Sequence, residues 1–360
     1  MISLNKTHES FLKSNKASEI LFAHDIPVGN LETLDSKTIQ VLEKALNEIN
    51  LTREEVLLLT MVEMNHVSIL MSVSNFLRKK YKGELISFSK NIFIPLTQLC
   101  RDQCSYCTFK YEPGEGDLFF SPEKVLEAAK KSTELGCTEM LFVSGDKPEL
   151  MYDVYKKELE KIGYSSTSDY MIGMSELCLE EGIFPHSNLG IAKIDELKRF
   201  KNSNPSMGLM LESISERLME PGEAHYRCPD KYPRARIKTI SDAGKLNIPW
   251  TSGILIGIGE NWEERVDSII ELKRINDEFG HIQEIIIQNF SPKPGIKMEG
   301  SPVPTDLDMI KTVAISKILM GKDVNIQVPP NLNAKTYTLH IFSGVNDLGG
   351  VSPLTIDYVN

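Results

Sequence analysis

The chain has 360 residues, of which 41% are hydrophobic and 25% are charged, a composition typical of a globular protein with a large apolar core. Its formal net charge of −10 argues against nucleic acid as the main partner. No apolar run approaches the roughly 18 residues that cross a bilayer, and the N-terminus lacks a signal-peptide core. We therefore expect a cytoplasmic protein with no membrane partner.

Residues 1–88 are predicted to form a helical N-terminal extension. Apolar residues recur at the helical period over 35–49 and 52–79, and Thr52 followed by Glu55 is typical of a capping box. No motif in this segment carries chemistry. We expect the extension to cover one end of the main domain.

Residues 89–360 are predicted to form an α/β domain, a (β/α)8 barrel of the TIM type. Strand patterns alternate with helix patterns, which is typical of a parallel barrel, and such barrels reach about 250 residues as one domain. Ser121 and Pro122 mark the start of the first helix, and Gly136 marks its end. The predicted strands cover 91–96, 139–143, 183–186, 207–211, 250–256, 284–288, 325–328 and a short segment near Val345. The predicted helices of this domain cover 122–136, 169–181, 193–201, 232–246, 262–279, 306–320 and 335–343.

A cysteine motif follows the first predicted strand. Cys100, Cys104 and Cys107 have the spacing C-x3-C-x2-C and account for three of the six cysteines. A loop at a strand end can wrap around a cluster and direct three thiolates inward, and thiolates are the soft ligands of iron–sulfur clusters. Three thiolates would leave one iron of a [4Fe–4S] cluster open to another ligand.

Two other interpretations of the motif remain open. The spacing also fits one face of a helix, where the cysteines would be inert and buried. A structural zinc site would need a fourth ligand, either a histidine or one of the remaining cysteines. None of these cysteines forms a second close pair, and cytoplasmic thiols stay reduced, so we expect them to be core or loop thiols without disulfides: Cys137, Cys178 and Cys228.

Polar residues at other predicted strand ends are candidates for cofactor binding, because the active site of such barrels lies at the C-terminal ends of the strands. Gly145 and Asp146 follow the second strand, where a simple turn is the alternative. Glu212 ends the fourth strand and could accept hydrogen bonds from ribose hydroxyls, or merely start a helix. Asn188 could assist with the same ligand.

Two further segments lie at the predicted mouth of the barrel. The turn Gly257-Ile258-Gly259 allows backbone to approach a flat ring, although its late position and missing third glycine exclude a dinucleotide fingerprint. The loop after the fourth strand offers His225 and Asp230 as groups for proton transfer. The alternative for this loop is a solvated surface segment.

The cysteine motif, with aromatic Tyr106 before the third cysteine, resembles the signature of the radical S-adenosylmethionine (SAM) superfamily. The resemblance implies that SAM chelates the open iron of the cluster through its amino and carboxylate groups. It also implies that Gly145-Asp146 binds the SAM amino group and that the turn at Gly257–Gly259 contacts adenine. The usual form of the first segment has two glycines and a glutamate, so Gly145-Asp146 departs from the pattern.

Several segments between residues 90 and 360 resemble one family within this superfamily, the 7,8-didemethyl-8-hydroxy-5-deazariboflavin synthases, or CofG subunits. The resemblance implies a carbon–nitrogen lyase that closes the central ring of a deazaflavin from the 5-amino-5-(4-hydroxybenzyl)-6-(D-ribitylimino)-dihydrouracil adduct. Ammonia leaves, and SAM is cleaved to methionine and 5′-deoxyadenosine. The segments that carry this resemblance are 94–109, 145–149, 205–212, 225–231, 253–260, 281–290, 328–332 and 349–353.

This family resemblance also implies partners. The adduct would come from a second radical SAM enzyme, CofH, and electrons from a low-potential donor such as ferredoxin or flavodoxin. Two alternative functions stay open: a related radical SAM enzyme of menaquinone or biotin-type chemistry, and a zinc-binding interaction module without catalytic activity.

Overall fold

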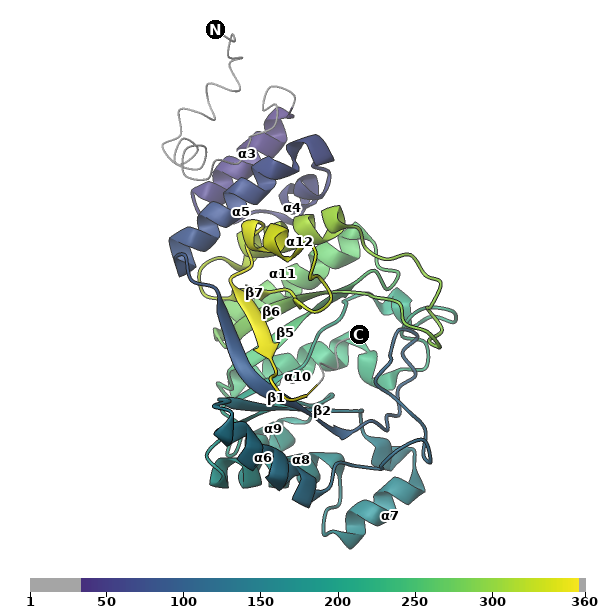
Figure 1. Ribbon diagram of the computed structural model, residues 1–360. Helices are drawn as coiled ribbons and strands as arrows, with labels where there is room; N and C mark the ends of the chain where they lie inside the picture. The colour runs from purple at the N-terminus through teal and green to yellow at the C-terminus, as the bar shows by residue number, and fades with distance from the viewer. Residues whose placement is uncertain (1–33, 356–360) are drawn as a thin grey trace.

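A computed structural model describes residues 34–355, and in this part of the chain eight parallel strands close into one barrel (Figure 1). Strand order follows chain order, and β8 pairs with β1 to complete the ring. The predicted (β/α)8 architecture is confirmed. The strand bounds are β1 Ser87–Thr97, β2 Glu139–Ser144, β3 Phe184–Asn188, β4 Ser206–Gly208, β5 Trp250–Ile256, β6 Ile282–Asn289, β7 Asn325–Gln327 and β8 Asp347–Val351.

Helices connect the strands and cover the outside of the barrel. Ser121 caps α6 through a hydrogen bond from the Lys124 amide, with Pro122 in its first turn, as the sequence predicts. Asn261 and Glu264 form a capping box at the start of α11, and Gly280 ends it in the left-handed region. The helix bounds are α6 Pro122–Glu134, α7 Asp153–Lys161, α8 Thr167–Glu180, α9 Ile194–Phe200, α10 Pro233–Lys245, α11 Trp262–Phe279, α12 Asp306–Met320 and α13 Tyr337–Phe342.

Two predictions in this domain were wrong in detail. Helix α7 was not predicted, because its nine residues bury only Tyr155 and Leu159 and give a weak periodic signal. The eighth strand lies at Asp347–Val351 rather than near Val345. Its two adjacent glycines, Gly349 and Gly350, lower the strand signal that sequence patterns rely on.

The N-terminal extension is helical over its described part and consists of α3 (Ser36–Leu46), α4 (Arg53–Thr60), η2 (Met64–His66) and α5 (Val67–Lys82). Thr52 and Glu55 form the predicted capping box. The single helix predicted over 52–79 was wrong, because the chain breaks after Thr60 and resumes at Met64. Residues 1–33 of the predicted extension lie outside the described residues.

Polar contacts attach the extension to the outer helices of the barrel. The Arg53 guanidinium donates to Asp267, with 2.9 Å between Nη2 and Oδ2, and pairs with Glu263 of the same helix, α11. Lys311 of α12 donates to the carbonyl of Thr60 at 2.6 Å. Figure 1 shows α3, α4 and α5 together above α11 and α12, at one side of the barrel. The described part of the extension therefore packs against outer helices of the barrel.

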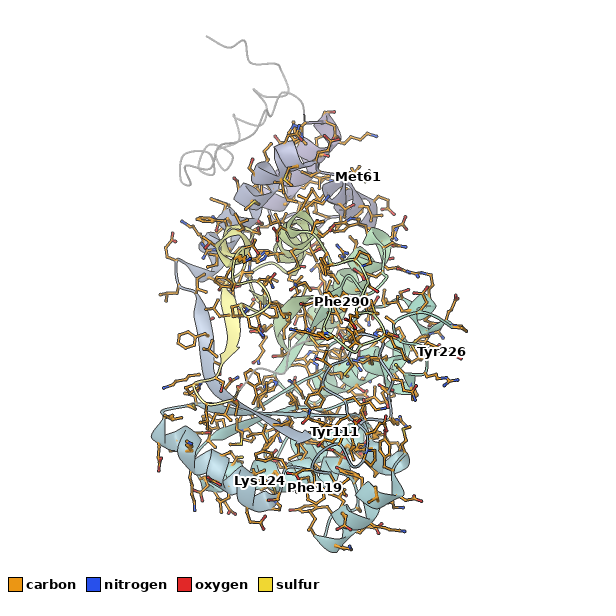
Figure 2. All side chains as sticks on the ribbon, turned by 45° about the vertical axis from the view of Figure 1, so that its right-hand side comes forward. Met61, Tyr111, Phe119, Lys124, Tyr226 and Phe290 are labelled. Atoms are coloured by element: carbon orange, nitrogen blue, oxygen red, sulfur yellow. The ribbon has the colours of Figure 1, made fainter. Side chains whose placement is uncertain are left out.

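Within the described residues, no single helix is long and apolar enough to cross a membrane. Helix α4 together with the segment Met64–Lys82 passes the same length and composition test only as a pair bent by 104°. In Figure 2 Met61 lies at the bend between them, and 75% of its surface is exposed.

The strands divide their side chains between two environments. On β1, Ile92 and Ile94 are 0% and 1% exposed and join the apolar core between sheet and helices, whereas Asn91 and Phe93 line the barrel interior. This alternation follows from the two-residue period of a strand. The interior of the barrel is therefore available for binding.

Candidate active site

The barrel encloses a cavity of about 600 Å³. The cysteine loop closes its upper end, at the C-terminal ends of the strands, where barrel enzymes place their active sites. Most of the predicted site residues meet in this cavity although they come from four different segments of the chain: Cys100, Cys104, Tyr106, Cys107, Gly145, Asp146, Asn188 and Glu212.

The turn at Gly257-Ile258-Gly259 does not line this cavity. These three residues line a second cavity of about 410 Å³, together with Ser105 and Tyr226. Figure 2 shows Tyr226 near the outer edge of the molecule, and its exposed fraction is 37%. The strand that leads to the turn reaches the main cavity through Leu255 instead, a residue that the sequence analysis did not single out.

Backbone hydrogen bonds hold the cysteine loop between two neighbouring loops. The Ser105 amide donates to the Ala224 carbonyl at 2.9 Å, and the Met298 amide donates to the Ser105 carbonyl at 3.1 Å. The Cys107 amide donates to the Cys104 carbonyl at 3.1 Å, which closes a turn between the last two cysteines. The motif is therefore an ordered loop and not the face of a helix.

Gly145 and Asp146 pack directly against this loop. A Cβ atom on Gly145 would lie 1.9 Å from the Leu99 carbonyl oxygen, so only glycine fits there. The Asp146 amide donates to Cys100 Sγ at 3.1 Å, and the Arg101 amide donates to the Asp146 carbonyl at 3.0 Å. Hydrogen bonds to cysteine sulfur orient a ligand and tune the potential of a bound cluster.

The three thiols are spread more widely than a zinc site requires. In a tetrahedral site with bonds of about 2.3 Å, sulfurs lie about 3.8 Å apart. Among residues 34–355, the group of three ligand atoms within 4.8 Å of one another is Asp102, Asp146 and Asp230, and the thiols form no such group. Three separated thiols around a shared cavity fit the larger iron–sulfur cluster.

Asp230, predicted to transfer protons, is buried behind the cysteine loop. It is 0% exposed and forms a two-pronged ion pair with the Arg101 guanidinium. Its amide donates to Asp102 Oδ1 at 3.2 Å. Burial, followed by repulsion from Asp230 and Asp102, raises the pKa of Asp146 to about 7. Asp230 does not line the main cavity, and its geometry is that of an anchor for the loop.

His225, the second predicted proton-transfer group, is also removed from the cavity. It is 1% exposed, and its Nε2 lies 3.0 Å from the hydroxyl of Tyr106, whose ring it meets edge-on. Burial and the charge of Lys231 lower the pKa of His225 to about 3. The geometry gives no support to direct proton transfer by His225 and indicates that it positions Tyr106 against the cavity.

Burial of a neutral His225 should make stability depend on pH. The unfolded chain binds a proton there below its ordinary pKa of 6.5, whereas the folded protein does so only near pH 3, so stability falls as pH drops through this window. Between pH 7 and pH 5 the loss is about 2 kcal/mol. We expect His225→Phe to lack this part of the pH dependence in denaturant unfolding of the cluster-free protein. Identical pH slopes for both proteins would contradict the buried, neutral state.

Two cations beside Glu212 were missed by the sequence analysis. Lys231 Nζ donates to Glu212 Oε1 at 2.6 Å, and Arg236 Nη2 lies 3.8 Å from the same oxygen. Burial alone would raise the pKa of Glu212, but Lys231 and Arg236 lower it, so the carboxylate is ionised. All three residues line the cavity, which leaves this wall with one excess positive charge. The sequence signal was Arg236, a charged residue placed on the apolar face of α10.

Glu212 itself has an unusual backbone. Its φ of +64° lies in the left-handed region, which costs a residue with a side chain about 1 kcal/mol or more. Its amide donates to the Gly253 carbonyl, and its carbonyl accepts from the Leu255 amide, so strand β5 holds this conformation on both sides of the residue. Strain held in place by the surrounding structure is typical of functional positions.

The family model of the radical SAM superfamily matches residues 94–272. This stretch holds the cysteine loop, Glu212 and the two cations described above. The chain is a radical SAM enzyme: it belongs to a superfamily in which a [4Fe–4S] cluster and SAM act together.

Curated relatives define the family more narrowly. The chain is 49% identical over 278 residues to the 7,8-didemethyl-8-hydroxy-5-deazariboflavin synthase of Methanopyrus kandleri, covering 77% of this chain and 83% of that one. It is 52% identical over 275 residues to the synthase of that name in Methanothermobacter thermautotrophicus, covering 76% and 83%. The chain therefore belongs to the 7,8-didemethyl-8-hydroxy-5-deazariboflavin synthase family, and the interaction-module alternative is excluded.

Solved structures with low sequence identity share the fold. Methylornithine synthase (PylB) aligns with a TM-score of 0.70 at 18% identity, covering 88% of this chain and 87% of that one. The FeFe-hydrogenase maturase HydG from Carboxydothermus hydrogenoformans aligns with a TM-score of 0.70 at 20% identity, covering 90% and 73%. At these identities the likeness concerns the barrel alone.

Proposed function

We propose that this enzyme closes the central ring of the deazaflavin chromophore, starting from the hydroxybenzyl–ribitylimino–dihydrouracil adduct and releasing ammonia. It would thus be a carbon–nitrogen lyase of deazaflavin coenzyme biosynthesis. The observation that carries this proposal is that three thiols and an ionised Glu212–Lys231 pair line one cavity, in a chain of this synthase family. Cys100, Cys104 and Cys107 would hold a [4Fe–4S] cluster, which would supply the electron for the cleavage of SAM to methionine and 5′-deoxyadenosine.

In this proposal, residues of different charge bind different groups of SAM. Lys231 and Arg236 offer positive charge for the methionyl carboxylate, and Glu212 can accept hydrogen bonds from vicinal ribose hydroxyls. Asn188 lines the same wall and has an amide for either group. Leu255 supplies apolar surface for the adenine, while contact by Gly257–Gly259 remains a prediction. With SAM and substrate bound, the cavity walls would limit the access of water to the reacting carbon and fix its orientation.

SAM affinity tests this assignment. We expect Glu212→Gln to weaken SAM binding by about 1.5–3 kcal/mol, because a hydrogen bond to a charged group is lost. Lys231→Met should weaken it at least as much, since a buried Glu212 would also lose its partner. Equilibrium binding to cluster-loaded protein measures both, and Lys238→Met on the exposed face of α10 serves as the matched control. Unchanged SAM affinity in Glu212→Gln would remove Glu212 from the ribose role.

The proposed reaction is tested with anaerobically reconstituted protein, reductant, SAM and the CofH product. Fluorescent deazaflavin, ammonia and 5′-deoxyadenosine are the expected products. SAM cleavage without deazaflavin would indicate a radical SAM enzyme with another substrate. Deazaflavin made from tyrosine and the ribitylamino-uracil without CofH would mean that one chain performs both halves of the synthesis.

The proposed reaction also requires partners. CofH supplies the adduct, and a low-potential donor such as ferredoxin or flavodoxin supplies electrons in the cytoplasm. Pull-down of CofH by this protein, with and without adduct, distinguishes a stable complex from release and capture of a free intermediate.

A further inference from the structure

The cavity does not end at the level of the cysteine loop. It continues to the N-terminal ends of the strands, where Glu139, Asn325 and Asp347 are the first residues of β2, β7 and β8. Strand β2 spans five residue steps from Glu139 to Ser144, which at about 3.3 Å per residue and a tilt of about 36° is a depth of about 13 Å. We call this deeper part the lower chamber and define it by six lining residues: Asn91, Glu139, Glu284, Asn325, Gln327 and Asp347.

The lower chamber differs in charge from the upper cavity, the part of the main cavity beside the cysteine loop and Glu212. Its six defining residues are three carboxyl groups and three amides. Among the described residues that line the whole cavity, the lysines and arginines are Lys110, Lys231 and Arg236, which lie beside the cysteine loop or Glu212. An anionic ligand group would therefore meet carboxylates without a compensating cation in the lower chamber.

One amide in the lower chamber lacks a partner. Asn91 is 2% exposed, and its Oδ1 has no hydrogen-bond partner, although buried oxygens usually have one. Its Nδ2 lies 3.5 Å from Glu139 Oε1, the upper limit for a hydrogen bond. Asn91 lines the cavity, and a small shift of its buried amide would let a ligand hydroxyl supply the missing donor.

The backbone of β8 leaves room for these amides. A Cβ on Gly350 would lie 2.2 Å from Asn91 Nδ2, and a Cβ on Gly349 would lie 1.9 Å from Gln327 Nε2. Any other residue at these two positions would displace the amides from their present places. The adjacent glycines that weaken the strand signal are thus explained by the polar side chains beside them.

The chamber offers hydrogen-bond donors as well as acceptors. Burial, together with the nearby Asp347 and Glu139, raises the pKa of Glu284 well above its ordinary value, which favours the protonated form that can donate a hydrogen bond. The carboxylates accept, the protonated acid donates, and the amides do both. Such a mixture has no lysine or arginine among the six residues that define the chamber, and it complements a chain of neutral hydroxyl groups.

We propose that the lower chamber binds the ribityl tail of the substrate and selects the tail without a phosphate group. The identity of the substrate rests on the proposed function, whereas recognition of a neutral polyol rests on the chamber itself. With the tail held below, the ring system lies in the upper cavity, next to Glu212, Lys231 and the cysteine loop.

Binding of the fluorescent product tests this proposal without turnover. The probes are the deazaflavin with its ribityl tail, its 5′-phosphate, and an analogue with an N-pentyl tail, titrated into cluster-loaded protein with SAM. We expect the phosphate and pentyl compounds to bind about 100-fold or more weakly than the ribityl compound. Asn91→Leu and Glu139→Gln should each reduce the preference over the pentyl tail about tenfold. Glu139→Gln should also reduce discrimination against the phosphate.

Glu180→Gln, which removes a charge from the exposed face of α8, is the control and should keep every ratio. Equal affinities for the three tails in the wild type, or no binding of the ribityl compound, overturn the proposal, as do unchanged ratios in both chamber variants. Thermal unfolding verifies that the variants fold. Tail selection without ring closure would support the role of the lower chamber and reject the proposed function. Ring closure without tail selection would support the proposed function and reject the role of the lower chamber.

Discussion

Replacing any one of Cys100, Cys104 or Cys107 with Ala should abolish cluster binding. The wild type, reconstituted without oxygen, should hold about four irons per chain at this site. The three thiols are the cysteine sulfurs that line the main cavity, and two remaining thiolates cannot fix a cluster whose other ligand is SAM. Iron and sulfide analysis, with the absorbance of the cluster, measures the loss. SAM cleavage should disappear together with the iron.

The other three cysteines provide the controls. Cys137 and Cys178 are buried in the core, and Cys178 Sγ lies 3.2 Å from the sulfur of Met140. Cys228 is the stringent control, because its thiol lies near that of Cys104 and, together with burial, raises the pKa of Cys104. Cys228→Ala should keep its iron and sulfide. Loss of the cluster in this variant would mean a fourth protein ligand and would contradict an iron left open for SAM.

Breaking the Arg101–Asp230 pair should destabilise the protein by about 3–5 kcal/mol, the range for removing one partner of a buried ion pair. Asp230 is 0% exposed, whereas 24% of the Arg101 side chain is exposed, so Asp230 gives the cleaner test. In Asp230→Asn the Arg101 charge loses its carboxylate, and the cysteine loop loses the contact that ties it to the segment after Glu212. Denaturant unfolding of cluster-free protein measures the change.

The Arg101–Asp230 prediction also separates a positioning residue from a catalytic one. We expect Arg101→Met to resemble Asp230→Asn in both stability and cluster retention, because the two changes remove the same contact. A general acid or base would behave differently, losing about 10²–10⁴-fold in rate while stability stayed unchanged. A loss of rate with unchanged stability in Asp230→Asn, but not in Arg101→Met, would support the catalytic role of Asp230 that the sequence suggested. Arg234→Met, at a 78% exposed side chain that pairs with Glu216, is the matched control.

The sequence by itself determined the class of fold and the cluster motif, because both depend on short-range patterns. Apolar alternation and helix caps such as Ser121-Pro122 are local, and eight strand–helix repeats can close in only a few ways. The cysteine spacing is equally local. Helix α7 was missed because it is short and polar, which weakens the periodic pattern. Strand β8 was misplaced because Gly349 and Gly350 weaken its strand pattern.

Only the tertiary structure decided the environment of each polar residue. His225 and Asp230 stand in a polar, proline-bounded segment that suggests exposure, yet closure of the barrel buries both behind the cysteine loop. Lys231 and Arg236 become a charged cavity wall only because the η5 (Pro229–Lys231) and α10 backbones bring them to Glu212. The lower chamber joins side chains from strands up to about 250 residues apart in sequence. No local pattern contains such proximity, because burial and charge pairing are properties of the closed barrel.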